Sequence, residues 1–138
     1  MTSKDEYRPG RHVVSAMHVH LVFITKYRPG VFNDEMLTAC ENTMRKVCED
    51  FEAELKEFNG ETDHVHLLVQ YPPKVAVSTL VNSLKGVSSR ILRRDFTARM
   101  NRAITHERFW SPSYFAASSG DAPLTMMRQY IEQQRRPL

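Results

Sequence analysis

TDHVHLLVQYPP, Thr62 to Pro73, has the composition of an apolar strand, yet it carries two histidines one residue apart. Side chains two residues apart share one face of a strand, so His64 and His66 point the same way, about 7 Å apart at Cα. Three apolar side chains point the other way, into a core: Val65, Leu67 and Val69. From this face two imidazoles can bind one divalent ion. Paired histidines on a strand are also often ordinary surface residues, so the pair alone leaves both interpretations open.

The segments around this strand alternate between strand and helix patterns. Residues 12–27 read as a long strand with two faces: Val19, Leu21 and Phe23 on one, and His20, Val22 and Ile24 on the other. Residues 51–60 also suit a helix extension, but we favour a strand for two reasons. The strand that carries the two histidines (the histidine strand) needs an antiparallel partner, and the sequence NGET at 59–62 is typical of a turn. The expected elements are strands at 12–27, 51–60, 64–70 and 108–119, and helices after Asn33, from 77 to 94 and from 124 to about 135, with a loop at 95–107.

This order predicts an α+β fold with two strand–helix–strand units around one sheet. Such a plan is ferredoxin-like (RRM-like): an antiparallel sheet with helices on one face and a more open second face. The terminal helix, about 123–135, falls outside the plan and therefore has an additional role. Residues 1–138 suit a single domain, because no repeat or linker divides them.

Composition narrows the functional classes. No apolar run approaches the ~18 residues of a membrane span, and no secretory leader pattern opens the sequence, so we expect a cytoplasmic protein with no membrane partner. The two cysteines, Cys40 and Cys48, lie on one apolar helix face, and we expect buried free thiols and no zinc finger.

The charge is divided unevenly along the chain. The formal net charge is +3, but residues 1–73 carry −4 and residues 74–138 carry +7. A basic half suits a phosphate backbone as partner, although many soluble proteins have such patches.

The terminal helix supplies a second set of polar groups in QYIEQQ, residues 129–134. Tyr130 and Gln134 are four residues apart and stack on one helix face. A half-buried aromatic at helical spacing is the ordinary interpretation of such a tyrosine. The combination of a phenol, an amide and a basic helix end favours a catalytic one.

Five segments together resemble the single-tyrosine HUH transposases of the insertion-sequence 200/605 type. These are HVH at 64–66, QYIEQQ at 129–134, HLVFITKYRPGVF at 20–32, LKGVSSRILRRDF at 84–96 and FWSPSYFAASSGDAPLTMMRQYIEQQ at 109–134. The resemblance spans residues 13–134. One departure is that the sequence runs only four residues past Gln134, whereas some relatives continue, so we expect any role of that extension to be missing or filled otherwise.

The resemblance implies a transposase that cleaves and rejoins single-stranded DNA at hairpin-bearing element ends, through a covalent tyrosyl–phosphate intermediate. The matching nucleophile is Tyr130, and the matching metal ligands are His64, His66 and Gln134. Mg²⁺ or Mn²⁺ is the expected ion, although imidazoles bind zinc, nickel or copper more tightly in general. Asp63 is expected either to orient an imidazole from behind or to be a solvated turn residue.

The resemblance also implies partners. These are single-stranded DNA with a hairpin and a second copy of the chain, in a homodimer whose active sites combine histidines of one chain with the tyrosine of the other. Basic and aromatic side chains expected to contact DNA follow the first strand or line the second helix: Lys26, Tyr27, Arg28, Lys85, Arg90, Arg93 and Arg94. Sequence leaves open whether others line the site or pack: His18, His20, Trp110, Tyr114 and the hydroxyls of SPS at 111–113.

Two alternatives remain at this stage. One is a domesticated relative that nicks repeated palindromes without a mobile element. The other is a ferredoxin-like nucleic-acid-binding module without catalysis, although such modules usually carry stacked aromatics where this strand carries histidines.

Overall fold

The computed structural model describes residues 16–26, 30–103, 108–118 and 124–135. Four strands and four helices follow one another in this part of the chain: β1 (Met17–Ile24), α1 (Asp34–Asp50), β2 (Glu54–Gly60), β3 (His64–Tyr71), α2 (Val77–Asp95), α3 (Thr97–Ala103), β4 (Phe115–Ser118) and α4 (Leu124–Arg135).

The strands form one antiparallel sheet in the order β2-β3-β1-β4. This is the ferredoxin-like arrangement expected from the element order, so the predicted fold class is confirmed. The histidine strand β3 is central and pairs along its whole length with β1, where His66 faces Val22 and His64 faces Ile24.

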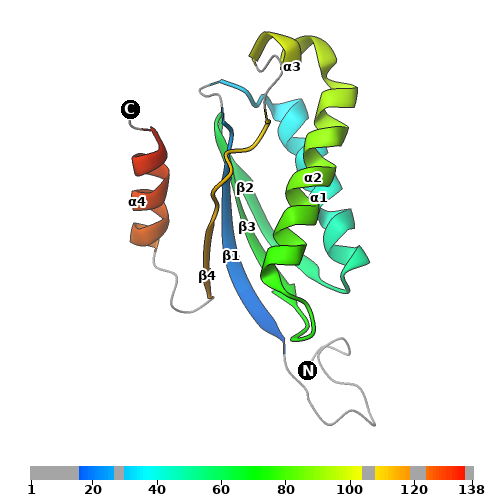
Figure 1. Cartoon of the computed structure of the whole chain (residues 1–138), viewed down its shortest axis with the longest axis vertical. Coiled ribbons are helices and arrows are strands. Elements are labelled where there is room, and N and C mark those ends of the chain that lie inside the picture. Colours follow the sequence, from blue (N-terminus) through cyan, green and yellow to red (C-terminus); the bar gives the residue numbers. More distant parts are fainter. Residues whose placement is uncertain (1–15, 27–29, 104–107, 119–123, 136–138) are drawn as a thin grey trace.

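The sheet has two covered faces (Figure 1), with α1 and α2 on one side and α4 on the other. The main core lies under α1 and α2, where the side chains of Leu21, Phe23 and Leu67 are fully buried. Alternation along β1 turns Val22 and Ile24 the other way, and there they pack against Met127 of α4. The second face is therefore partly closed by the terminal helix.

Helix α1 begins and packs as its sequence predicts. Asn33 caps α1, and its side-chain oxygen accepts a hydrogen bond from the amide of Met36 at 2.9 Å. The apolar stripe of α1 is buried against the sheet and against α2, and both Cys40 and Cys48 are buried free thiols, as expected. No helix in the described part of the chain is both long and apolar enough to cross a membrane.

Two expected elements differ from the structure. Residues 95–107 were expected to be a loop, but 97–103 form α3, whose buried Met100 packs onto the main core, and 104–107 lie outside the described residues. The last strand was expected over 108–119, but β4 contains only Phe115–Ser118.

The residues before β4 bond elsewhere. Trp110 makes an isolated bridge to Thr25, and its indole N–H donates to Ser88 of α2 at 3.0 Å, which draws the segment away from the strand path. Pro112, which has no N–H for a ladder bond, follows shortly after.

Smaller differences concern element ends. Of the long first strand expected at 12–27, β1 covers Met17–Ile24, and residues 12–15 and 27 lie outside the described part. The strand expected at 51–60 begins at Glu54 because α1 continues to Asp50 and its end is closed by the Phe51 amide, which donates to the carbonyl of Cys48 at 2.9 Å.

Candidate active site

The second face of the sheet gathers the polar side chains that the sequence singles out. His64 and His66 point to this face, because their strand partners Ile24 and Val22 pack under α4. His20 also belongs to it, because it alternates with Leu21 and lies opposite Leu68. His18, two residues before His20 on β1, lies on this face as well. Four imidazoles of the described residues and a helix thus share one side of the sheet, which we call the histidine face.

His64 is held by its neighbour in the chain. Its Nδ1 lies 2.9 Å from the Asp63 carboxylate, and both side chains are buried. The backbone of Asp63 is itself fixed, because its carbonyl accepts hydrogen bonds from the amide and the hydroxyl of Thr25 at 3.0 and 3.2 Å. Asp63 therefore orients the ring, and Nε2 is the nitrogen of His64 that this contact leaves open.

His66 makes a contact that the sequence left undecided. Its Nε2 lies 2.9 Å from Nδ1 of His20, and the two rings are nearly parallel with centroids 5.2 Å apart. Burial lowers the pKa of His66, and the neighbouring His20 lowers it further, so the neutral imidazole that a metal requires is favoured. The period-2 alternation of 18–24 was the signal that put His20 on this face, but only the register of β1 and β3 brings the two rings together.

Tyr130 lies on α4, which docks on the same face. Its ring packs against Phe115 of β4 with centroids 5.7 Å apart, and its hydroxyl lies 2.8 Å from the hydroxyl of Ser113. Burial raises the pKa of Tyr130, and the hydrogen bond with Ser113 only partly offsets this, so the side chain is a neutral phenol in this arrangement. From the sequence, Ser113 was only one of the undecided hydroxyls.

Gln134 is one turn further along α4 and is half-buried. Among the described residues, no hydrogen bond joins its amide to His64 or His66, so the structure brings together the two histidines but does not complete the expected ligand set. Within the same described ranges, no three His, Cys, Asp or Glu side chains gather as a metal site.

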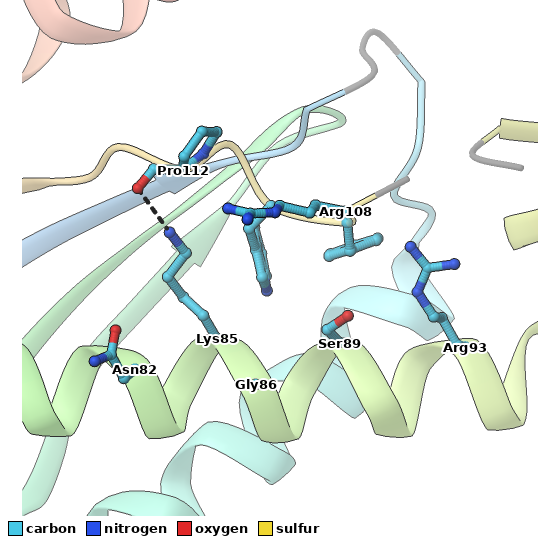
Figure 2. A pocket seen from close by; sticks show the side chains of 9 residues that line it. Asn82, Lys85, Gly86, Ser89, Arg93, Arg108 and Pro112 are labelled. Carbon is cyan, nitrogen blue, oxygen red and sulfur yellow. Dashed lines mark hydrogen bonds between the residues drawn. The ribbon is translucent and has the colours of Figure 1, made fainter. Parts of the chain in front are cut away.

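A basic pocket of about 570 Å³ lies between α2 and the segment before β4. Figure 2 shows Lys85, Ser89 and Arg93 reaching from α2 toward Arg108 and Pro112. Lys85 already has a hydrogen-bond partner, because its ammonium donates to the carbonyl of Ser111 at 2.8 Å. Burial lowers the pKa of Lys85, and the nearby charge of Arg108 lowers it further. The described residues that line the pocket include three cations and no carboxylate, which suits a phosphate.

The other expected DNA contacts are dispersed. Lys26 and Arg90 are exposed, and Arg94 is exposed but forms an ion pair with Asp95 at 2.8 Å. Tyr27 and Arg28 lie outside the described residues. Arg108 was not among the predicted contacts, because its position beside the pocket depends on the fold of the segment before β4.

The family follows from comparison with known proteins. A family model described as "Transposase IS200 like" matches residues 13–134. The chain belongs to the IS200-like transposase family. The resemblance of the five sequence segments is thereby confirmed, and the chain is a transposase by family.

Two relatives illustrate the relationship. The transposase for insertion sequence element IS200 of Salmonella typhimurium is 32% identical over 115 residues, covering 83% of this chain and 74% of that protein. The ISDra2 transposase TnpA of Deinococcus radiodurans is 29% identical over 131 residues, covering 94% of this chain and 91% of that protein.

Two solved structures share the architecture. A crystal structure of a candidate transposase from Deinococcus radiodurans R1 superposes with a TM-score of 0.84 at 28% identity, covering 95% of this chain and 100% of that chain. A REP-associated tyrosine transposase bound to a REP hairpin superposes with a TM-score of 0.53 at 13% identity, covering 92% of this chain and 68% of that chain. The second likeness shows the fold alone.

Proposed function

We propose that this transposase cleaves and rejoins single-stranded DNA, with Tyr130 as the nucleophile and with assistance from a divalent metal ion held by His64 and His66. The observation that carries the proposal is that α4, which bears Tyr130, packs on the face of the sheet to which both histidines point. A ferredoxin-like module that only binds nucleic acid has no need of a buried, oriented histidine on the same face of the sheet as a docked tyrosine.

Tyr130 performs a phosphoryl transfer in this proposal. Its phenol oxygen bonds to a DNA phosphorus as the phenol proton leaves to solvent. The bond from phosphorus to the 3′ oxygen breaks, and that oxygen takes a proton from solvent and leaves as a hydroxyl. The tyrosyl–phosphate ester conserves the energy of the broken link, so a second DNA hydroxyl can reverse the step and join a new strand. No nucleotide cofactor is required.

The donor set fits a divalent cation. His64 is oriented by Asp63, the lowered pKa of His66 favours its neutral form, and Gln134 is the amide expected to complete the set. Mg²⁺ or Mn²⁺, when bound by these three side chains, would supply positive charge that polarises a phosphate oxygen. Two imidazoles and an amide add no negative charge, so they would leave the charge of the ion undiminished.

Activation of Tyr130 requires a change from the arrangement observed. The phenol is held by Ser113 and its pKa is raised by burial, so it is a poor nucleophile at rest. A nearby cation would favour the phenolate and would therefore lower that pKa. Attack by Tyr130 therefore requires that its hydroxyl give up the hydrogen bond with Ser113.

The substrate proposed is single-stranded DNA that carries a hairpin. The REP-associated tyrosine transposase was solved with a REP hairpin bound, and the basic pocket of this chain suits a DNA backbone. The first observation supports a hairpin-forming strand as the ligand, and the second supports binding of its phosphates.

Fluorescence anisotropy against salt tests the role of the pocket. The double variant Arg93→Gln with Arg108→Gln should flatten the plot of the logarithm of the DNA-binding constant against the logarithm of the salt concentration, because binding releases fewer counterions. Replacing Lys56 and Lys74, exposed lysines on other surfaces, should leave the slope unchanged. A slope that stays at the wild-type value in the pocket variant would remove the pocket from the interface.

Within the single chain described here α4 packs on its own sheet. We propose that in a homodimer the same helix docks on the sheet of the partner, so that each active site combines the histidines of one chain with Tyr130 of the other. The family resemblance supports it. The sequence between β4 and α4 supports it too, because SSGDAP at 118–123 contains a glycine at which a chain can turn. A helix exchanged between chains is a low-cost route to such sites.

Complementation tests the shared sites. Tyr130→Phe chains are mixed with His66→Ala chains under conditions that exchange subunits. Shared sites should restore cleavage, because one site of the mixed dimer is intact. Continued inactivity, with exchange verified by differently sized tags, would show that each site is built within one chain.

The chemistry is tested by incubating the protein with a labelled single strand that carries a hairpin, followed by a denaturing gel. A covalent protein–DNA band should appear with Mn²⁺ and should be absent in chelator. Full adduct formation in chelator would contradict the metal assignment, and no adduct on any hairpin-bearing strand would favour a binding module.

A further inference from the structure

His20 lies on the histidine face beside His66, and no role has yet been assigned to it. Its Nδ1 and the Nε2 of His66 are 2.9 Å apart. A neutral imidazole has one N–H and one lone pair, so one ring donates and the other accepts. The direction of this hydrogen bond decides what His66 can do.

Two directions are possible and only one leaves His66 able to bind a metal. If His20 donates, Nε2 of His66 accepts and its proton resides on Nδ1, so both nitrogens are used. If His66 donates from Nε2, its Nδ1 carries a free lone pair. A metal-binding His66 that keeps this contact therefore requires His20 as the acceptor.

His64 has the corresponding arrangement with the nitrogens reversed. The carboxylate of Asp63 lies 2.9 Å from Nδ1, so that nitrogen carries the proton and Nε2 keeps its lone pair. Each histidine of the pair thus has one orienting partner: Asp63 for His64 and His20 for His66. Metal-binding histidines commonly donate their second N–H to such a partner, and its loss typically costs about 10- to 100-fold in metal affinity.

We propose that His20 is a positioning residue of the metal site, which accepts a hydrogen bond from Nε2–H of His66 and so presents Nδ1 of His66 to the ion. This inference rests on the proposed metal site, and it assigns opposite ring nitrogens to the two histidines, Nε2 of His64 and Nδ1 of His66. His20 acts through His66 and does not itself touch the ion.

The test separates two properties of the His20 side chain: its hydrogen-bond acceptor and the shape of its ring. Mn²⁺ binding to the full-length protein without DNA is measured by calorimetry. His20→Phe keeps a ring but removes the acceptor, and it should weaken binding about 10- to 100-fold. His20→Asn presents an amide oxygen near the place of Nδ1 and should stay within a few-fold of wild type. His18→Ala, on the same strand and face, is the control and should bind as wild type.

A role in packing predicts the reverse order, because Phe fills the space better than Asn. Weaker binding in His20→Asn than in His20→Phe, or wild-type affinity in His20→Phe, would overturn the inference. Electron spin echo spectra of bound Mn²⁺ should show two coordinated imidazoles, and three would make His20 a ligand instead.

A second readout needs no metal. Nitrogen-15 NMR of the metal-free protein should find His66 protonated at Nε2 in wild type and in His20→Asn, and redistributed toward Nδ1 in His20→Phe. His66 protonated at Nδ1 in wild type would contradict the inference. If wild type fails to bind Mn²⁺ at all, the proposed metal site fails, whereas the tautomer of His66 still decides whether His20 is the acceptor.

Discussion

Removal of the side chain of Met127 should release α4 from the sheet while the main core stays folded. Met127 is 4% exposed and packs against Val22 and Ile24 in a small cluster separate from the core under α1 and α2. Truncating a buried Met to Ala costs roughly 2 to 5 kcal/mol, and a site at the lower end, ~2 to 3 kcal/mol, suits a cluster of this size. Since ~1.4 kcal/mol is a factor of ten, the undocked population should rise roughly 30- to 150-fold.

The lost docking energy should destabilise α4 alone. This helix has 12 residues, and an isolated helix of that length is only marginally stable in water. Amide hydrogen exchange read by mass spectrometry should therefore show faster exchange in 124–135 and unchanged exchange in α2. Formation of the covalent DNA adduct should fall with it, because undocking carries Tyr130 away from the histidine face.

The adjacent methionine supplies a matched control. Met126 is 48% exposed, so Met126→Ala makes the same chemical change without removing a buried contact. It should leave both exchange and cleavage as in wild type. Equal protection of 124–135 in Met127→Ala and wild type would refute the reasoning, as would equal damage from the two alanines.

Three further measurements check the thiols, the histidine face and the cap of α1. Burial raises the pKa of Cys48 to about 12 and also raises that of Cys40. Neither thiol should therefore react with a disulfide reagent at pH 8 until denaturant is added. Rapid labelling of the native protein would contradict their burial. In metal-free buffer the unfolding free energy should fall as the pH drops below 6.5, because the lowered pKa of His66 means that the unfolded chain binds the proton more readily; His66→Gln should reduce this slope, and an identical slope would assign it to other groups. Asn33→Ala removes the α1 cap and should cost about 1 kcal/mol in thermal or denaturant unfolding, with Thr38→Ala, exposed within α1, as the comparison.

Much of the fold could be predicted because its signals are local. The alternation in 18–24 and 64–70 indicated which side chains face the core, and Asn33 marked the start of α1. Residues 95–103 and 108–114 were harder, because their structure depends on partners distant in the chain. Trp110 bonds to Ser88 and Lys85 bonds to the carbonyl of Ser111, and no pattern within these residues announces either contact.

In the candidate site, too, some residues could be identified from the sequence whereas their contacts could not. His64, His66 and Tyr130 belong to recognisable motifs and were named from sequence. The contact of His66 with His20 arises from the register of β1 and β3, and the contact of Tyr130 with Ser113 arises from the docking of α4. Side-chain pairs from separate elements require the three-dimensional arrangement, whereas strand faces follow from spacing.

The most direct measurement of the proposed chemistry is the location of the DNA on the protein. The adduct formed with Mn²⁺ on a hairpin-bearing single strand is digested with trypsin and nuclease, and the modified peptide is sequenced by mass spectrometry. Cleavage after Arg128 and Arg135 yields residues 129–135, in which Tyr130 is the only hydroxyl side chain. We predict the nucleotide mass on this peptide, and its absence from the Tyr130→Phe and His64→Ala proteins. A nucleotide attached to the peptide that contains Tyr114, or an undiminished adduct in Tyr130→Phe, would contradict the assignment of the nucleophile.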